Sequence, residues 1–233
     1  MKLYWFTFFN VFILISLWFN GSLLAQKAQT KKKLPIIESA ATGNRDFYVI
    51  FLTGDFGYRN FDKAIVHGLN VKKVSVVVLN AQNYFYSKKS PAQLGYDLGS
   101  IINQYTRKWN KKRVILMGYS MGAEVLPFAV NRLEDKYKQQ LKDVILIGPS
   151  QKAIFRLKPT DYLFEEKKGT DIFTELLKMK PQRSFIICDD NPNSLCRKNL
   201  DGISDHEFLG GGHHFGHDYL LLSELIGQRI NLE

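Results

Sequence analysis

Cysteine is scarce in this sequence of 233 residues. It contains two cysteines, Cys188 and Cys196, and it has no arginine-rich arm, zinc-ligand cluster or aromatic-basic motif. These absences exclude the common nucleic-acid-binding modules, so we expect no nucleic-acid partner. The chain also lacks internal repeats, low-complexity segments and interior linkers. We therefore expect one domain with one sizeable core, which a chain of this length can build.

Acidic residues are too few to balance the basic ones. The chain has 32 Lys and Arg residues against 22 Asp and Glu residues, which gives a net charge of +10 and a pI near 9.5. The basic residues form scattered pairs and triplets, at residues 31–33, 72–73, 88–89, 111–113 and 167–168. An ordinary solvated surface accounts for most of them. In an exported protein the excess also favours contact with an anionic membrane surface.

The N-terminal segment does not read as part of a folded core. After Lys2, residues 3–24 are almost wholly apolar, small residues occur near Ala25, and a basic polar run follows. This order predicts a secretory signal peptide over residues 1–25, with an uncleaved membrane anchor as the alternative. No cysteine lies near the junction, which argues against a lipid-attached form. In either case we expect the folded part outside the cytoplasm, after a polar tether at residues 26–45.

From residue 46 onward, β-branched and aromatic runs alternate with amphipathic stretches of helical period. Several runs, such as VSVVVL, VILIG and FIIC, are continuously apolar, which is typical of parallel strands buried on both faces. The alternation predicts a single α/β domain over residues 46–233, with helices on both faces of a mostly parallel sheet and little or no cap. Residues 150–166 are less regular and predict a hairpin or a small cap. We expect strands at residues 47–52, 74–79, 113–117, 144–147, 183–187 and 205–209, and helices at residues 61–69, 91–109, 121–133, 170–179 and 217–229.

Residues 118–122 read GYSMG, a G-x-S-x-G motif, and their context is informative. The motif directly follows the apolar run VILM and opens the helical stretch AEVLPFAVNRL. This is the arrangement of a nucleophile elbow, in which the serine occupies a strained strand-to-helix turn. The turn places the hydroxyl at a helix N-terminus, where the dipole favours a developing oxyanion. We therefore expect the α/β-hydrolase fold with Ser120 as the nucleophile; a tight turn with an incidental serine is the alternative.

A serine nucleophile needs a base, and in hydrolases of this fold the histidine comes last in the chain order Ser, acid, His. Of the five histidines, only His67 precedes Ser120. The glycines at residues 210–212 lead into His213 and His214, between the last expected strand and the last expected helix. We expect His213 to be the base, with His214 as the alternate. A metal site or a plain surface position is the other interpretation of the pair, and we expect neither a metal ion nor a cofactor.

The acid of the triad should follow the penultimate strand. The run FIIC ends in Asp189 and Asp190, and we expect Asp190 to be the acid, with Asp189 as the close alternate. In an oxidising compartment Cys188 and Cys196 could pair, and the bridge would fix this loop. Two unrelated thiols are the alternative.

An oxyanion hole needs two aligned N–H donors. One should be the backbone N–H of Met121, the residue after the nucleophile. The second should come from the loop after the first strand, where glycines allow close backbone approach. Asp55 and Phe56 are the expected donors in that loop.

A longer set of segments extends these motifs: TGD (53–55) with Asp62, YFYSKKSP (84–91), KKR (111–113), GYSMGAEVLPF (118–128), NRL (131–133), GPS (148–150), Cys196 and GGHHF (211–215). Together they resemble the VirJ family of bacterial proteins and the similar C-terminal domain of AcvB, from about Phe47 to the C-terminus. The resemblance implies a periplasmic protein associated with virulence and DNA-transfer secretion. It also implies hydrolysis of the aminoacyl ester of lysyl-phosphatidylglycerol. Glu124 stands where the family usually has aspartate, and Cys188-Asp189 where we expect a glycine-containing turn.

Charged residues near the expected site give such a substrate a physical rationale. Glu124 lies one helical turn beyond Ser120 and Asp55 lies in the oxyanion loop, so both could meet a lysyl amine. Lys88 and Lys89 come after the strand at residues 74–79, on the side where ligands bind in such sheets, and could hold a lipid phosphate. Ordinary surface ions are the alternative.

Two functions of different classes follow. The leading one is a periplasmic esterase acting on an aminoacylated anionic phospholipid, with the anionic membrane surface as its substrate source. The alternative is a catalytically weak scaffold that assists a secretion or virulence system. We expect a monomer, with secretion-system proteins as candidate partners.

Overall fold

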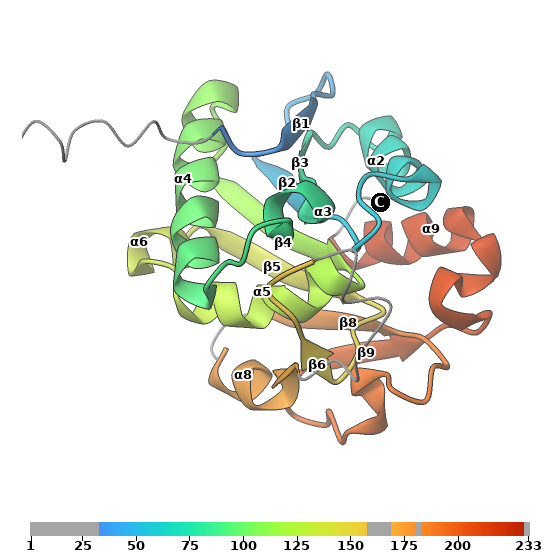
Figure 1. The fold of residues 1–233 in the computed structure, drawn as a ribbon. Helices are drawn as coiled ribbons and strands as arrows, with labels where there is room; N and C mark the ends of the chain where they lie inside the picture. Colours follow the sequence, from blue (N-terminus) through green and yellow to red (C-terminus); the bar gives the residue numbers. More distant parts are fainter. Residues whose placement is uncertain (1–32, 158–168, 180–182, 231–233) are drawn as a thin grey trace, which may run out of the picture. The chain divides into compact units, whose positions relative to one another are not determined.

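The structure, a computed structural model, describes residues 33–157, 169–179 and 183–230 (Figure 1). The chain divides into two compact units, residues 1–34 and 35–233. The signal peptide expected at residues 1–25 lies outside the described residues, and the fold below is that of the second unit. None of the helices in the described ranges combines the length and the apolar character needed to span a membrane.

A seven-stranded sheet forms the centre of this unit (Figure 1). The strand order is β1-β3-β2-β4-β5-β8-β9, and every neighbouring pair is parallel except β1 and β3. All six strands expected from the sequence are present, which confirms the mostly parallel α/β sheet. The strands are β1 (Ile36–Ser39), β2 (Phe47–Leu52), β3 (Val76–Leu79), β4 (Arg113–Tyr119), β5 (Leu141–Ile147), β8 (Ser184–Cys188) and β9 (Asp205–Phe208).

The strand β1 corrects the expected tether at residues 26–45. Residues Ile36 to Ser39 pair antiparallel with β3 and form one edge of the sheet. The sequence IIES is too short and too mixed in polarity to predict a strand. Its extended conformation is stabilised by pairing with β3 and not by a pattern of its own. The folded domain therefore begins about ten residues earlier than expected.

Helices cover both faces of the sheet (Figure 1). On one face, Val49 and Phe51 of β2 pack in the same cluster as Ile65 of α2 and Ile226 of α9. On the other face, the hydroxyl of Tyr48 donates to the Ile102 carbonyl of α4 at 3.2 Å, α5 packs against α4, and α8 packs against α5. The helices are α2 (Asn60–Val71), α3 (Ala81–Phe85), α4 (Pro91–Trp109), α5 (Met121–Asn131), α6 (Asp135–Lys138), α8 (Ile172–Lys178) and α9 (Tyr219–Arg229).

Local sequence signals account for the bounds of the longest helix, α4. Ser90 caps its first turn, with its hydroxyl accepting the Gln93 N–H at 3.1 Å, and Pro91 occupies the first helical position. Asn110 ends the helix in a left-handed conformation with φ 50°. These signals explain why the expected helix at residues 91–109 agrees with the structure.

The region after β5 is the least regular. A two-residue antiparallel pair joins β6 (Lys152–Ala153) to β7 (Thr170–Asp171). Residues 158–168 lie outside the described residues, so the hairpin or cap expected at residues 150–166 is described only in part.

Candidate active site

Ser120 occupies a sharp turn between β4 and α5. Its backbone has φ 51° and ψ −120°, a conformation that costs a residue with a side chain on the order of 1–3 kcal/mol. The flanking glycines make the turn possible: a Cβ at Gly118 would lie 2.4 Å from the Gly122 carbonyl carbon, and one at Gly122 would lie 2.2 Å from the Leu52 oxygen. Although Ser120 is the N-cap of α5, its side chain makes no capping bond. The hydroxyl is therefore available to other partners.

Three parallel strands bring a hydrogen-bonded chain of side chains together at their carboxyl ends. Ser120 follows β4, Asp189 follows β8, and His213 lies beyond β9 in the 3-10 helix η2 (Gly212–His217). The Nε2 atom of His213 is 2.9 Å from Ser120 Oγ, and its Nδ1 atom is 2.6 Å from Asp189 Oδ2. This is the geometry of a Ser-His-Asp triad.

The acid in this arrangement is Asp189, and the preference for Asp190 is wrong. Asp189 is 1% exposed and faces His213. Asp190 is exposed, and its backbone carbonyl accepts a hydrogen bond from Arg197 at 2.8 Å. Successive side chains of extended chain point to opposite sides, so a shift of one residue decides which carboxylate meets the imidazole.

The surroundings of Asp189 keep it ionised. Burial raises the pKa of its carboxyl, but the hydrogen bond and charge of His213, helped by the Ser194 hydroxyl, bring the pKa below its ordinary value. The Cys188–Cys196 disulfide expected from the sequence is present. It ties the end of β8 to the 3-10 helix η1 (Leu195–Arg197) and so anchors the loop that carries Asp189.

Two residues to which the sequence analysis gave no role hold His213 in place. Gly148, just after β5, has φ +56°, and a Cβ there would lie 3.3 Å from the His213 ring and 3.4 Å from Asp189 Oδ2. Tyr119 stacks on His213 with ring centroids 5.3 Å apart, and its hydroxyl donates to the His213 carbonyl at 3.1 Å. Tyr119 is the first variable position of G-x-S-x-G. No local pattern assigns either residue a role, because each acts through contacts distant in sequence.

His214 faces Tyr119 instead of the serine. Its Nδ1 atom is 2.9 Å from the Tyr119 hydroxyl, and its ring stacks on His217 at 5.7 Å. Burial and the neighbouring imidazoles of His213 and His217 lower the pKa of His214, which keeps it neutral at pH 7. The arrangement favours His213 over His214 as the partner of Ser120.

The loop after β2 passes beside the nucleophile, where the second oxyanion donor is expected. A Cβ at Gly54 would lie 3.3 Å from the Tyr119 ring and 3.5 Å from Ser120 Cβ. Asp55 and Phe56 follow at once, and the Phe56 side chain is 61% exposed. On the other side, the N–H of Met121 is the first of α5 and needs no partner within the helix. Both expected sources of N–H donors thus flank the Ser120 turn.

Asp62 anchors this loop from the first turn of α2. Its Oδ2 accepts the Arg59 N–H at 2.9 Å, while its Oδ1 is buried without a hydrogen-bond partner among the described residues. Burial raises the pKa of Asp62 to about 6, against the lowering effect of backbone N–H groups that include those of Arg59 and Gly54. The carboxylate therefore joins the oxyanion loop to α2 at an electrostatic cost.

The residues expected to bind substrate differ in their surroundings. Glu124, in the first turn of α5, accepts a hydrogen bond from the Ser150 hydroxyl at 2.6 Å. Lys88 and Lys89 lie between α3 and α4, and the Lys89 ammonium lies 4.8 Å from the Tyr84 ring centroid. Across the described ranges, no contact joins either lysine to the triad, and no three His, Cys, Asp or Glu side chains are grouped to hold a metal ion.

One protein-family model matches most of the chain. The model, described as "Bacterial virulence protein (VirJ)", covers residues 46–232 and so includes the whole triad. A search of curated proteins finds no match to this sequence.

The fold is similar to those of several solved structures. MenH from S. aureus aligns with a TM-score of 0.61 at 12% identity, over 84% of this chain and 98% of that one. Est1E from Butyrivibrio proteoclasticus gives 0.61 at 10% identity, over 84% and 91%. A lipase-esterase related protein from Clostridium acetobutylicum gives 0.60 at 13% identity, over 84% and 98%. At these identities the likeness shows the fold alone, and it confirms the predicted α/β-hydrolase fold.

Proposed function

This chain belongs to the VirJ family of bacterial virulence proteins, and we propose on that basis, and from its triad, that it is a serine hydrolase that cleaves ester bonds. One observation carries the proposal. Ser120 Oγ, His213 and Asp189 form a continuous hydrogen-bonded chain, with distances of 2.9 and 2.6 Å, at the carboxyl ends of the parallel strands β4, β8 and β9.

The geometry supports acylation of the serine. The Asp189 carboxylate accepts the Nδ1–H of His213, which leaves the Nε2 lone pair facing Ser120 Oγ. As Oγ attacks the ester carbonyl, Nε2 takes its proton, and Asp189 stabilises the imidazolium that forms. The N–H of Met121, with that of Asp55 or Phe56, receives the negative charge on the carbonyl oxygen. His213 then gives the proton to the leaving alcohol.

Deacylation repeats these roles with water. His213 takes a proton from water as the water oxygen attacks the acyl-enzyme carbonyl, and returns that proton to Ser120 Oγ as the acid leaves. The net reaction converts an ester and water into a carboxylic acid and an alcohol. The His213 side chain is 34% exposed, so water can reach the imidazole.

The proposed substrate is the aminoacyl ester of an anionic phospholipid, of the lysyl-phosphatidylglycerol kind. The family resemblance is the first support. The second is Glu124, which lies one helical turn from Ser120 and whose carboxylate accepts the Ser150 hydroxyl. Asp55, in the loop beside the nucleophile, adds a second carboxylate. Lys88 and Lys89 are proposed to meet the lipid phosphate, and the periplasm is the proposed location.

Labelling with a fluorophosphonate tests the hydrolase proposal, because such a probe is trapped only by an activated serine. We expect one adduct, on Ser120, and none in Ser120→Ala with unchanged thermal unfolding. Wild-type protein that folds but takes no label would contradict the mechanism. That result would favour the alternative of a scaffold that assists a secretion or virulence system.

A matched pair of esters tests the substrate class separately. Norleucine has the side-chain length of lysine without its amine, so lysyl and norleucyl esters of one alcohol differ mainly in charge. We expect faster cleavage of the lysyl ester, and Glu124→Gln should reduce the preference by an amount on the order of 1–3 kcal/mol. Equal cleavage rates for the two esters, in wild type and in Glu124→Gln, would contradict the proposed lysyl substrate and leave the hydrolase proposal intact.

A further inference from the structure

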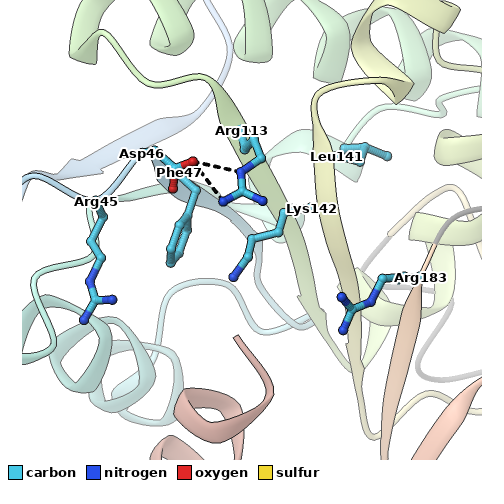
Figure 2. A pocket seen from close by; sticks show the side chains of 7 residues that line it. All are labelled: Arg45, Asp46, Phe47, Arg113, Leu141, Lys142 and Arg183. Atoms are coloured by element: carbon cyan, nitrogen blue, oxygen red, sulfur yellow. Dashed lines mark hydrogen bonds and ion pairs between the residues drawn. The ribbon is translucent and has the colours of Figure 1, made fainter. Parts of the chain in front are cut away.

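A cavity of about 510 Å³ lies at the amino ends of β2, β4, β5 and β8 (Figure 2). The residues that line it begin these strands or directly precede them, from Asp46 before β2 to Arg183 before β8. The triad lies beyond the carboxyl ends of the same parallel sheet. With seven residues in β4, the two sites are separated by roughly 20 Å, so one small ligand cannot occupy both.

The lining of this cavity is strongly cationic. Arg45, Arg113, Lys142 and Arg183 contribute four positive groups to the lining, and Asp46 contributes its one carboxylate. Behind the lining, the buried carboxylate of Asp143 pairs with Arg183, with its Oδ1 3.4 Å from Nε. Figure 2 shows the guanidinium groups of Arg45 and Arg183 on opposite sides of the Lys142 amine. Asp46 already pairs with Arg113, since its Oδ2 is 2.9 Å from both Nε and Nη2. In the part of the chain that the structure describes, Arg45 has no carboxylate partner.

The surroundings of Lys142 disfavour its positive charge. Its ammonium lies 4.4 Å from the Phe47 ring centroid and donates to the Ile230 carbonyl at 2.6 Å. Burial lowers the pKa of Lys142, and the charges of Arg113 and Arg183 lower it further, although Asp143 and Asp46 act in the opposite direction. An anion in the cavity would stabilise the ammonium.

We propose that this cavity is a binding site for the phosphate groups of an anionic ligand. Arginine side chains suit such a ligand, because the planar guanidinium donates two parallel hydrogen bonds to phosphate oxygens. Lys142 adds a point charge between them. The volume fits a small phosphorylated molecule or a lipid headgroup. The site also gives a role to Arg113 of the KKR segment, which the triad does not use.

A soluble polyphosphate and a phospholipid headgroup carry the same phosphate chemistry. They differ in what they would do to the enzyme. A bilayer bound at this cavity would lie against the amino ends of the strands, at the opposite end of the sheet from Ser120. A soluble ligand would leave the carboxyl end free to meet a lipid surface. The experiment therefore needs one arm for each source.

Calorimetric titration with pyrophosphate at low ionic strength is the first arm. The double variant Arg45→Gln/Arg183→Gln should bind at least tenfold more weakly than wild type. The control Arg107→Gln/Lys198→Gln removes the same charge at two exposed residues outside the cavity and should bind within twofold of wild type. Ser120→Ala should bind like wild type, which keeps this inference separate from the hydrolase proposal. Equal losses in both double variants, or no binding by wild type in either arm, would overturn the site.

Vesicles of phosphatidylcholine with one quarter phosphatidylglycerol are the second arm. Selective loss of vesicle binding in Arg45→Gln/Arg183→Gln identifies the lipid headgroup as the source, whereas pyrophosphate binding alone identifies a soluble ligand.

Phenylglyoxal modification gives a readout on wild-type protein, so a folding defect in a variant cannot decide the outcome. The ligand that binds should protect Arg45 and Arg183 and leave Arg107 reactive. Equal reactivity of all three with and without ligand would contradict the proposal.

Discussion

The two ends of the central sheet hold their charged groups in contrasting ways. At the carboxyl ends, Asp189 is buried and 2.6 Å from His213, which in turn lies 2.9 Å from Ser120. At the amino ends, long basic side chains surround an open cavity; Arg113 pairs with the half-exposed Asp46, and Arg183 pairs with Asp143 behind the lining. The same parallel strands support both arrangements.

This contrast reflects what each end has to do. Transition-state stabilisation needs groups that are fixed before the reaction, and the strained backbone of Ser120 and the buried Asp189 are what fixing them requires. Attraction of an anion from solvent needs only a positive field, which partly exposed basic side chains supply. Equivalent substitutions at the two ends should therefore have effects of different size and kind.

Neighbouring histidines give the largest expected effect at the carboxyl end. His213→Ala should lower kcat on the order of 10⁶-fold, because it removes the proton acceptor of Ser120. His214→Ala should cost far less, since His214 contacts Tyr119 and not the serine. Single-turnover kinetics on a small ester measure both. The reverse ranking would place the base one residue later in the chain.

Substitutions of the neighbouring carboxylates Asp189 and Asp190 should give the second-largest effect on kcat. Asp189→Asn should lower kcat by about 10⁴-fold, because an amide no longer holds His213 in the tautomer that accepts the serine proton. Asp190→Asn is the matched control and should retain the wild-type rate, since its side chain is exposed. Fluorophosphonate labelling rates provide a second measurement. An inactive Asp190→Asn with an active Asp189→Asn would contradict the geometry of this loop.

The buried charge of Asp62 predicts a pH effect on stability. Its folded pKa of about 6 lies above the ordinary value of 3.8, so the native state holds a proton that the unfolded chain has lost. Stability from this group is present below about pH 4 and is lost as pH rises through about 6. Because of this group, the free energy of unfolding of the wild type should be up to about 3 kcal/mol higher at pH 4 than at pH 7, and Asp62→Asn should remove that difference. Urea unfolding at both pH values tests this, and parallel profiles for the two proteins would show that Asp62 is not perturbed.

Most of the fold could be predicted from the sequence because the signals are local. The continuous apolar strands, the capping residues of α4 and the GYSMG motif each specify their element without distant partners. The strand β1 was missed because four residues of mixed polarity take their order from β3 alone. An edge strand of this kind carries no pattern of its own.

The site was predicted less completely, for a different physical reason. Ser120 and His213 follow motif and chain order, whereas the choice between Asp189 and Asp190 depends on where β8 ends and on which side each residue then faces. The need for Gly148 arises only when the His213 ring packs against it. Contacts of this type exist only in the folded chain, so no sequence window contains them.

The smallest expected effect is at the amino end, where Asp46 offers a direct counterpart to Asp189. Asp46 and Arg113 form an ion pair of 2.9 Å with both side chains about half exposed. Asp46→Asn should therefore lower the free energy of unfolding by less than about 1 kcal/mol, and by less still at high salt, which screens the pair.

The same substitution should strengthen anion binding, because it removes the carboxylate that lines the cavity and frees Arg113 from its ion pair. Pyrophosphate should bind Asp46→Asn more tightly than wild type. The control Asp135→Asn changes the net charge equally at a highly exposed residue that pairs with Lys138, and its affinity should stay near the wild-type value. Weaker binding by Asp46→Asn, or a stability loss of several kcal/mol, would mean that Asp46 organises the amino end as Asp189 organises the carboxyl end. Both ends of the sheet would then hold their charged groups in fixed positions. The cavity would be a preorganised site and not a positive field open to solvent.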